Sequence, residues 1–144
     1  MKNILIVTGG TGGHVIPSIA LSEHLSKKFF VQIVTDLRGS KYISKNCYNY
    51  ELIDVPNLFK KFHLLPLNIL KYFLNIFKSI KFIKKNKIDI LISTGGYMTL
   101  PFCLAAFFLK KKIILFEPNS ILGRSNKIAL KFSSKVICYD INLK

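Results

Sequence analysis

Four glycines and a histidine stand together near the start of the chain, in the run GGTGGH at residues 9–14. Glycine lets the backbone turn sharply, and it lets a ligand approach main-chain N–H groups that a Cβ would shield. A helix that starts in such a loop adds unpaired N–H groups and the positive end of its dipole, and both favour a bound phosphate. The run therefore predicts an anion site, with a tight turn that binds nothing as the alternative.

The run differs from the two common nucleotide motifs. The dinucleotide pattern G-x-G-x-x-G, started at Gly10, needs a glycine where the chain has Val15, and the Gly-Lys-Ser/Thr of a P-loop is absent. A dinucleotide-binding domain, with Asp36 on the ribose, is therefore a weaker alternative.

His14 closes the glycine run at the expected start of a helix. The helix dipole disfavours a cationic imidazole at that position, and a neutral imidazole can accept a proton. His14 is thus a candidate general base. A histidine that only hydrogen-bonds the loop is an equally open interpretation.

Two further runs have similar chemistry. Thr94-Gly95-Gly96-Tyr97 is a second glycine turn, where Tyr97 could donate to a phosphate, stack on a sugar or pack on the next helix. Glu117-Pro118-Asn119 offers a carboxylate and an amide that can hold sugar hydroxyls, although Pro and Asn are also common in turns.

Short apolar runs that end in these loops predict strands of a parallel sheet. The expected strands cover residues 4–7, 31–34, 52–55, 88–92, 113–116 and 136–138, and the expected helices cover 15–28, 67–85, 100–109 and 124–131. Strands that alternate with helices predict an α/β, Rossmann-like, doubly wound parallel sheet. In such a sheet ligands bind beyond the carboxyl ends of the strands, so all three loops should lie at one edge.

Composition limits the class of protein. The chain has 144 residues, of which half are hydrophobic, so we expect one domain over residues 1–144 and no disordered chain. Its net charge of +15 suggests an anionic partner, and nucleic acid is disfavoured because nearly all the cations are lysines and no nucleic-acid-binding module is recognisable. The three cysteines, without paired spacing, favour free thiols in a reducing cytoplasm.

A long amphipathic segment lies between the third and fourth expected strands. Its polar stripe is narrow and its apolar arc, rich in Phe and Leu, is wider than a helix needs to cover a core. Lysines recur from residue 60 to residue 87, with no acidic residue between Asp54 and Asp89. The region 60–87 therefore predicts contact with an anionic membrane surface, and an ordinary crossover helix with solvated lysines is the alternative.

The motifs together resemble those of the MurG family, the UDP-N-acetylglucosamine:undecaprenyl-pyrophosphoryl-N-acetylmuramyl-pentapeptide N-acetylglucosaminyltransferases. The first motif, GGTGGHVIP at residues 9–17, is highly specific. Gly95-Gly96-Tyr97 with Pro101, and Glu117-x-Asn119 followed by Leu122-Gly123 and Asn126-Lys127, support it. The resemblance runs through the whole chain, in order and at matching spacing.

The resemblance implies the N-terminal, acceptor-binding half of a two-domain (GT-B type), inverting, metal-independent glycosyltransferase that needs no cofactor. Its substrates would be UDP-N-acetylglucosamine and the undecaprenyl-diphosphate-linked N-acetylmuramyl-pentapeptide, at the cytoplasmic face of the bacterial inner membrane. His14, as the base, and Glu117 match catalytic positions. The implied substrate-binding residues are Thr11, Gly12, Gly13, Gly95, Gly96, Tyr97 and Asn119.

Two departures from the family pattern bear on the expected activity of the chain. Phe116 and Pro118 stand where the family usually has His and Gln, so some positioning hydrogen bonds would be lost. The family's C-terminal, donor-binding domain is not in this sequence, so we expect the chain alone to be inactive and a separate C-terminal half to be a candidate partner. A non-catalytic membrane-docking subunit of a split lipid-linked sugar transferase is the alternative function.

Overall fold

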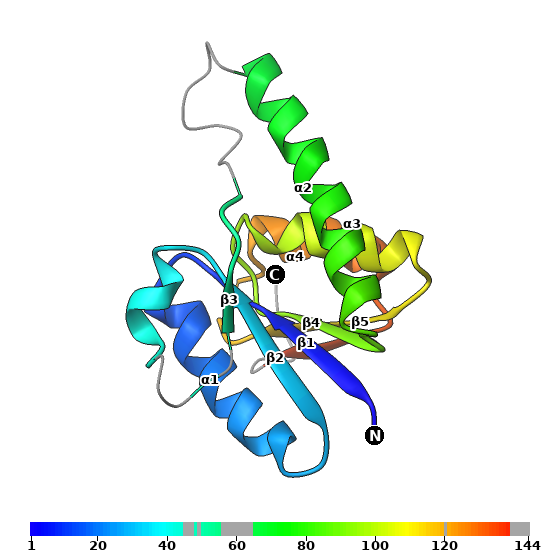
Figure 1. The fold of residues 1–144 in the computed structure, drawn as a ribbon. Helices are drawn as coiled ribbons and strands as arrows, with labels where there is room; N and C mark the ends of the chain where they lie inside the picture. Colours follow the sequence, from blue (N-terminus) through cyan, green and yellow to red (C-terminus); the bar gives the residue numbers. More distant parts are fainter. Residues whose placement is uncertain (45–47, 49, 56–64, 120, 139–144) are drawn as a thin grey trace.

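The computed structural model describes residues 1–44, 48, 50–55, 65–119 and 121–138. These residues form one sheet of six parallel strands in the order β3-β2-β1-β4-β5-β6 (Figure 1). The strands are β1 (Asn3–Val7), β2 (Phe30–Thr35), β3 (Tyr50–Leu52), β4 (Ile90–Ser93), β5 (Lys112–Glu117) and β6 (Lys135–Cys138). The helices are α1 (Gly12–Ser26), α2 (Leu65–Lys85), α3 (Thr99–Phe108) and α4 (Arg124–Ala129), with 3-10 helices η1 (Gly39–Tyr42) and η3 (Leu130–Phe132). The predicted α/β, doubly wound fold is confirmed.

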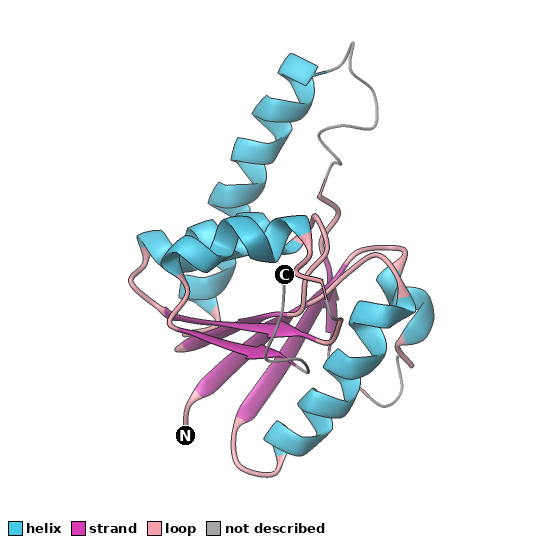
Figure 2. Cartoon of the chain, turned by 180° about the vertical axis from the view of Figure 1, so that it is seen from behind, coloured by secondary structure: helices cyan, strands magenta, loops and turns pink. Residues whose placement is uncertain are grey.

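Helices cover both faces of the sheet. Figures 1 and 2 show α1 on one face and α2, α3 and α4 on the other. Leu5 and Ile6 of β1 point to opposite faces, and both are fully buried. This two-sided burial is the reason that the central strands are continuous apolar runs.

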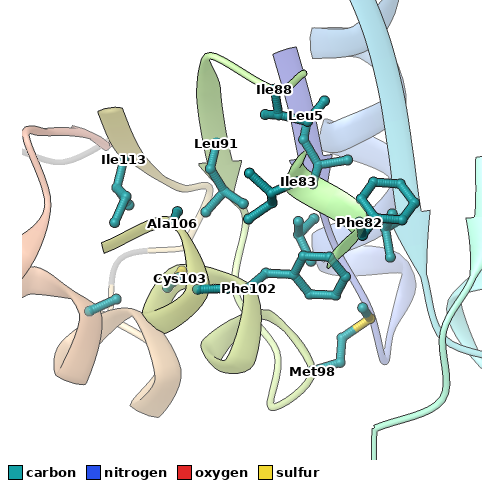
Figure 3. Close-up of a cluster of buried hydrophobic side chains, with 14 of the residues drawn as sticks. Leu5, Phe82, Ile83, Ile88, Leu91, Met98, Phe102, Cys103, Ala106 and Ile113 are labelled. Atoms are coloured by element: carbon teal, nitrogen blue, oxygen red, sulfur yellow. The ribbon is translucent and has the colours of Figure 1, made fainter. Parts of the chain in front are cut away.

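The larger hydrophobic core lies between the sheet and α2, α3 and α4. Figure 3 shows Leu5, Leu91 and Ile113, from three neighbouring strands, facing side chains of α2 and α3. At its centre Phe102 of α3 meets Phe82 of α2 edge to face, with ring centroids 6.0 Å apart. Complete burial of a side chain such as Phe102 stabilises the fold by about 1.5–3 kcal/mol.

Helix α2 extends past the rest of the molecule. Its C-terminal half packs on the core through Phe82 and Ile83, while its N-terminal half projects beyond the sheet and the other helices (Figures 1 and 2). Because α2 follows β3 and precedes β4, the projecting half lies beyond the carboxyl edge of the sheet. None of the helices in the described ranges is long and apolar enough to span a membrane.

Element boundaries differ from the sequence prediction in two informative places. Helix α1 begins at Gly12 rather than residue 15, because the glycine loop ends at Thr11, which is extended, and the last two glycines form the first helical turn. The third strand covers Tyr50–Leu52 rather than residues 52–55. Its partner β2 ends at Thr35, opposite Leu52, so the chain beyond Leu52 has little strand left to pair with.

Candidate functional site

Three loops leave the sheet at one edge. Val7, Ser93 and Leu115 lie opposite one another near the ends of β1, β4 and β5, so the loops that follow these strands emerge side by side. The strand order reverses between β1 and β4, which is the point where open α/β sheets bind ligands. The predicted common edge is confirmed.

The two glycine loops touch through their backbones. Gly95 and Gly96 have φ values of +96° and +90°, a conformation that side chains disfavour. A Cβ on Gly96 would lie 2.8 Å from the carbonyl oxygen of Gly9, so nothing larger than glycine fits there. The sequence predicts that the glycine loops lie at the same edge of the sheet, and the structure brings them into direct contact.

The two glycine loops in contact leave one side open, at Gly10 and Gly13. A Cβ on Gly10 would meet nothing nearer than Arg38 Nη2 at 3.5 Å, and one on Gly13 nothing nearer than Thr11 Oγ1 at 3.9 Å. The amides of Gly12 and Gly13, in the first turn of α1, have no acceptor within the helix. An anion can therefore approach main-chain donors on this side, whereas Met98 packs beneath Gly9 on the other.

His14 lies in the first turn of α1, partly buried against the second loop. A Cβ on Gly95 would come within 3.0 Å of His14 Cε1 and 3.2 Å of Nδ1. Nδ1 is buried, and no group in the described part of the chain hydrogen-bonds it. The His14 carbonyl accepts from Ser18 Oγ at 2.7 Å, and Ser18 Oγ lies 2.9 Å from Thr94 Oγ1. The imidazole therefore sits between the loops with one nitrogen uncommitted.

A buried carboxylate holds the loops in place. Asp36, at the end of β2, accepts hydrogen bonds from the amides of Gly10 (3.0 Å) and Gly39 (2.8 Å) and from the hydroxyl of Tyr97 (3.0 Å). Arg38 Nε lies 3.6 Å from the same carboxylate. Burial acts to raise the pKa of Asp36, but the two amides, Tyr97 and Arg38 act against it and leave that pKa below its ordinary value.

Tyr97 faces the first loop rather than open solvent. Its ring lies under Arg38, with the guanidinium carbon 5.1 Å from the ring centroid, and its hydroxyl donates to Asp36. Burial and the neighbouring Asp36 raise the pKa of Tyr97. Because its hydroxyl already donates a hydrogen bond to Asp36, Tyr97 joins the two loops. Its predicted part in substrate binding stays a prediction.

Glu117, a predicted catalytic residue, has both carboxylate oxygens engaged within the protein. It is fully buried, and its Oε1 accepts from the main-chain and side-chain nitrogens of Asn119 at 3.3 and 2.9 Å. Its Oε2 accepts from Gly123 N at 3.0 Å and Asn126 Nδ2 at 3.1 Å. Asn126 in turn accepts from Ser93 Oγ at 2.8 Å. This geometry favours a positioning role for Glu117, which holds the exposed Asn119 in place.

Several members of this network are not predicted from the sequence. Arg38 carries one of only two guanidinium groups in the chain and follows the carboxyl end of β2, which was the available signal. For Asp36 the sequence predicts only a ribose ligand. Ser18 and Ser93 give no signal in the sequence, because the contacts that join them to the network are with Thr94 and Asn126, which are far away along the chain.

Comparison with known proteins gives consistent results. The glycosyltransferase family 28 N-terminal domain matches residues 4–138. A UDP-N-acetylglucosamine--N-acetylmuramyl-(pentapeptide) pyrophosphoryl-undecaprenol N-acetylglucosamine transferase of Pelagibacter ubique is 50% identical over 99% of this chain and 40% of its own length. The Rickettsia typhi protein of the same name is 40% identical over 97% of this chain and 36% of its own. The chain thus spans about two fifths of the length of these curated relatives.

Solved structures share the fold. The crystal structure of Acinetobacter baumannii MurG superimposes with a TM-score of 0.84 at 24% identity, covering 100% of this chain and 43% of that one. A Staphylococcus aureus MnaA–UDP structure superimposes with a TM-score of 0.72 at 16% identity, covering 99% and 39%.

Proposed function

The chain belongs to the glycosyltransferase family 28 N-terminal domain family, and on that premise we propose that it provides the acceptor-binding half of an inverting N-acetylglucosaminyltransferase of peptidoglycan synthesis. The reaction moves N-acetylglucosamine from UDP-N-acetylglucosamine to the undecaprenyl-diphosphate-linked N-acetylmuramyl-pentapeptide. The observation that carries the proposal is the contact between the two glycine loops, which gathers main-chain donors and His14 at the switch point of the sheet.

The acceptor's diphosphate binds on the open side of the glycine loops. The amides of Gly12 and Gly13 and the dipole of the 15-residue helix α1 supply a preorganised anion site there. Arg38 adds a cation, since it is more than half exposed and its Nη2 lies 3.5 Å from the position that a Cβ on Gly10 would take. Gly95 and Gly96 complete the cradle by allowing the second loop to approach the first without side chains.

His14 acts as the general base. It takes the proton from the acceptor's 4-hydroxyl as that oxygen attacks the anomeric carbon of the donor sugar, and the bond from this carbon to UDP breaks. No protein group in the described part of the chain hydrogen-bonds its Nδ1, so the imidazole is not already engaged, which supports this role. Glu117 holds Asn119 and Gly123 in place, so that Asn119 and the Thr11–Gly13 segment can contact the donor sugar.

The donor half of the complete enzyme corresponds to the part of the relatives that this chain does not cover. Residues 1–144 form the N-terminal acceptor-binding domain in this proposal, and transfer requires the donor-binding half as a second domain or a separate partner. The chain alone then binds acceptor without turning it over.

Helix α2 docks on the cytoplasmic face of the inner membrane, as a peripheral contact. Its projecting half exposes a hydrophobic patch of large side chains, and these are Ile69, Leu70, Phe73, Leu74 and Phe77. Exposed lysines flank the patch, and each contributes about 1 kcal/mol near an anionic surface. Residues 60–64 of the predicted membrane region lie outside the described residues.

The test is a transfer assay with labelled UDP-N-acetylglucosamine and the lipid acceptor. The chain is assayed alone, and again with the C-terminal half of the Pelagibacter ubique relative added. We expect turnover only in the mixture. A mixture that binds both substrates without transfer would contradict the proposal, and membrane binding without acceptor binding would favour the docking-subunit alternative.

A further inference from the structure

A polar pocket lies against helix α2, away from the glycine loops. It has a volume of about 310 Å³ and is lined by Asp54, Lys71, Leu74, Asn75 and Lys78. The four α2 residues are spaced by three, four and seven positions, which places them on one face of the helix, and Asp54 comes from the segment after β3. Leu74 also belongs to the hydrophobic patch, so the pocket opens beside the surface proposed to meet the membrane.

The pocket combines charges of both signs that are not paired with each other. Lys71 and Lys78 are exposed cations and Asp54 is an exposed anion. Across the described residues the only ion pair is the one between Arg38 and Asp36. A simple anion would be attracted by the lysines but repelled by Asp54, so a ligand carrying both a negative and a positive group complements this pocket best.

Asn75 supplies the second polar feature. It is 95% buried, and its Nδ2 donates to the carbonyl of Lys71 at 2.9 Å. Its Oδ1 is buried and accepts no hydrogen bond from any described group. A buried acceptor without a partner is costly, and an ammonium can donate both to such an oxygen and to the Asp54 carboxylate, whose charge it neutralises.

We propose that this pocket binds the headgroup of an ethanolamine phospholipid. The phosphodiester contacts Lys71 and Lys78, the primary ammonium donates to Asp54 and the Asn75 oxygen, and the acyl chains lie along the hydrophobic patch. The inference rests on the membrane-docking part of the proposed function and adds to it a preference for one headgroup. A choline headgroup, which has no N–H, cannot make the donor contacts.

The experiment uses vesicles of phosphatidylcholine doped with either phosphatidylethanolamine or phosphatidylglycerol, and measures binding by cosedimentation. We expect ethanolamine lipid to strengthen binding of the unchanged chain over phosphatidylcholine alone. Asp54→Asn should reduce the affinity for ethanolamine vesicles about tenfold, the scale of one charge-assisted contact, while leaving that for glycerol vesicles intact or higher. Glu51→Gln, an exposed carboxylate on β3 outside the pocket, is the matched control.

Soluble headgroups separate a lipid from a free phosphodiester. Amide shifts of labelled protein are followed during titration with glycerophosphoethanolamine, glycerophosphoglycerol and inorganic phosphate. Shifts at Asp54 and Asn75 that are specific to the ethanolamine compound support the pocket independently of any bilayer. Equal binding of Asp54→Asn and unchanged protein to ethanolamine vesicles would overturn the proposal. Loss of binding to all vesicles alike, with the ethanolamine-specific shifts retained, would instead count against membrane docking and leave a site for a soluble phosphodiester.

Discussion

The hydroxyl of Tyr97 lies 3.0 Å from the Oδ2 of Asp36 and donates to it, which joins the loop after β4 to the end of β2. The same carboxylate holds the glycine loop after β1 through the amide of Gly10. One buried side chain therefore sets the relative position of the two glycine loops, and its hydrogen bond with Tyr97 spans 61 residues of the sequence.

Asp36→Asn should lower stability by about 1–3 kcal/mol at neutral pH, because an amide nitrogen would face donors that now meet a carboxylate. The folded-state pKa of Asp36 is lowered, so its contribution is present above the ordinary value of 3.8 and is lost as the pH falls through the folded value. Urea unfolding from pH 7 to about pH 3 should show a flatter acid limb in the variant. Glu51→Gln, on an exposed site, should leave the profile unchanged.

Gly96→Ala should destabilise the fold by about 2 kcal/mol or more, since a Cβ there meets the Gly9 carbonyl and the left-handed conformation is strained. Gly13→Ala is the control, because it places a methyl in open space on a helical turn and should change stability by less than about 1 kcal/mol. Urea unfolding compares them. Equal stability of the two variants would refute the backbone contact. Gly13→Ala should nevertheless weaken acceptor binding, because the methyl covers the proposed anion site.

His14→Ala should reduce transfer by about a hundredfold or more in the complemented assay, as expected for loss of a general base. His24→Ala, in the exposed last turn of the same helix, should retain full activity. Circular dichroism checks that both variants fold. An unchanged rate for His14→Ala would show that His14 is not the general base.

Glu117→Gln and Asn126→Ala should have effects of similar size if Glu117 acts by positioning, because each breaks the hydrogen-bonded network that links Ser93, Asn126 and the segment from Asn119 to Gly123. The loss of stability should be about 1–3 kcal/mol for each. In the transfer assay we expect comparable losses and an unshifted pH–rate profile. A far larger loss for Glu117→Gln, with a changed profile, would indicate direct catalysis.

Phe73→Ser with Phe77→Ser should weaken binding to vesicles of phosphatidylglycerol by at least about tenfold, because both side chains are more than half exposed in the hydrophobic patch. Added salt should also weaken the binding of the unchanged chain to these vesicles, since its lysines contribute to the attraction. Phe108→Ser, equally exposed but on α3, is the control and should bind normally. Cosedimentation that is insensitive to both Phe changes would exclude the patch as the docking surface.

The sequence predicts those parts of the fold that depend on local pattern. The apolar run of β1 predicts a buried strand, because a strand that is covered on both faces needs apolar residues at every position. The glycines at 9–13 predict the ligand-binding loop that follows it, because its backbone conformation favours glycine. The strand order was not predicted, but the shared edge of the three loops follows from the parallel arrangement alone.

The sequence cannot predict the long-range partners of buried polar groups. Asp36 looks like a strand-end carboxylate until Gly10, Gly39 and Tyr97 are seen to donate to it. Glu117 stands beside two turn-forming residues in the sequence, yet the chain folds back so that Asn126 hydrogen-bonds it. Of the predicted free thiols, Cys103 is buried and Cys138 exposed, and Cys47 lies outside the described residues.

The projecting half of α2 begins at the same edge of the sheet that carries the glycine loops. A protein resting on a bilayer through this half would turn that edge toward the lipid surface. The diphosphate of a polyprenyl lipid could then reach the loops while its tail stayed in the membrane, so encounter would become a lateral search in two dimensions. The length of one helix would thereby set how far above the bilayer the sugar is transferred.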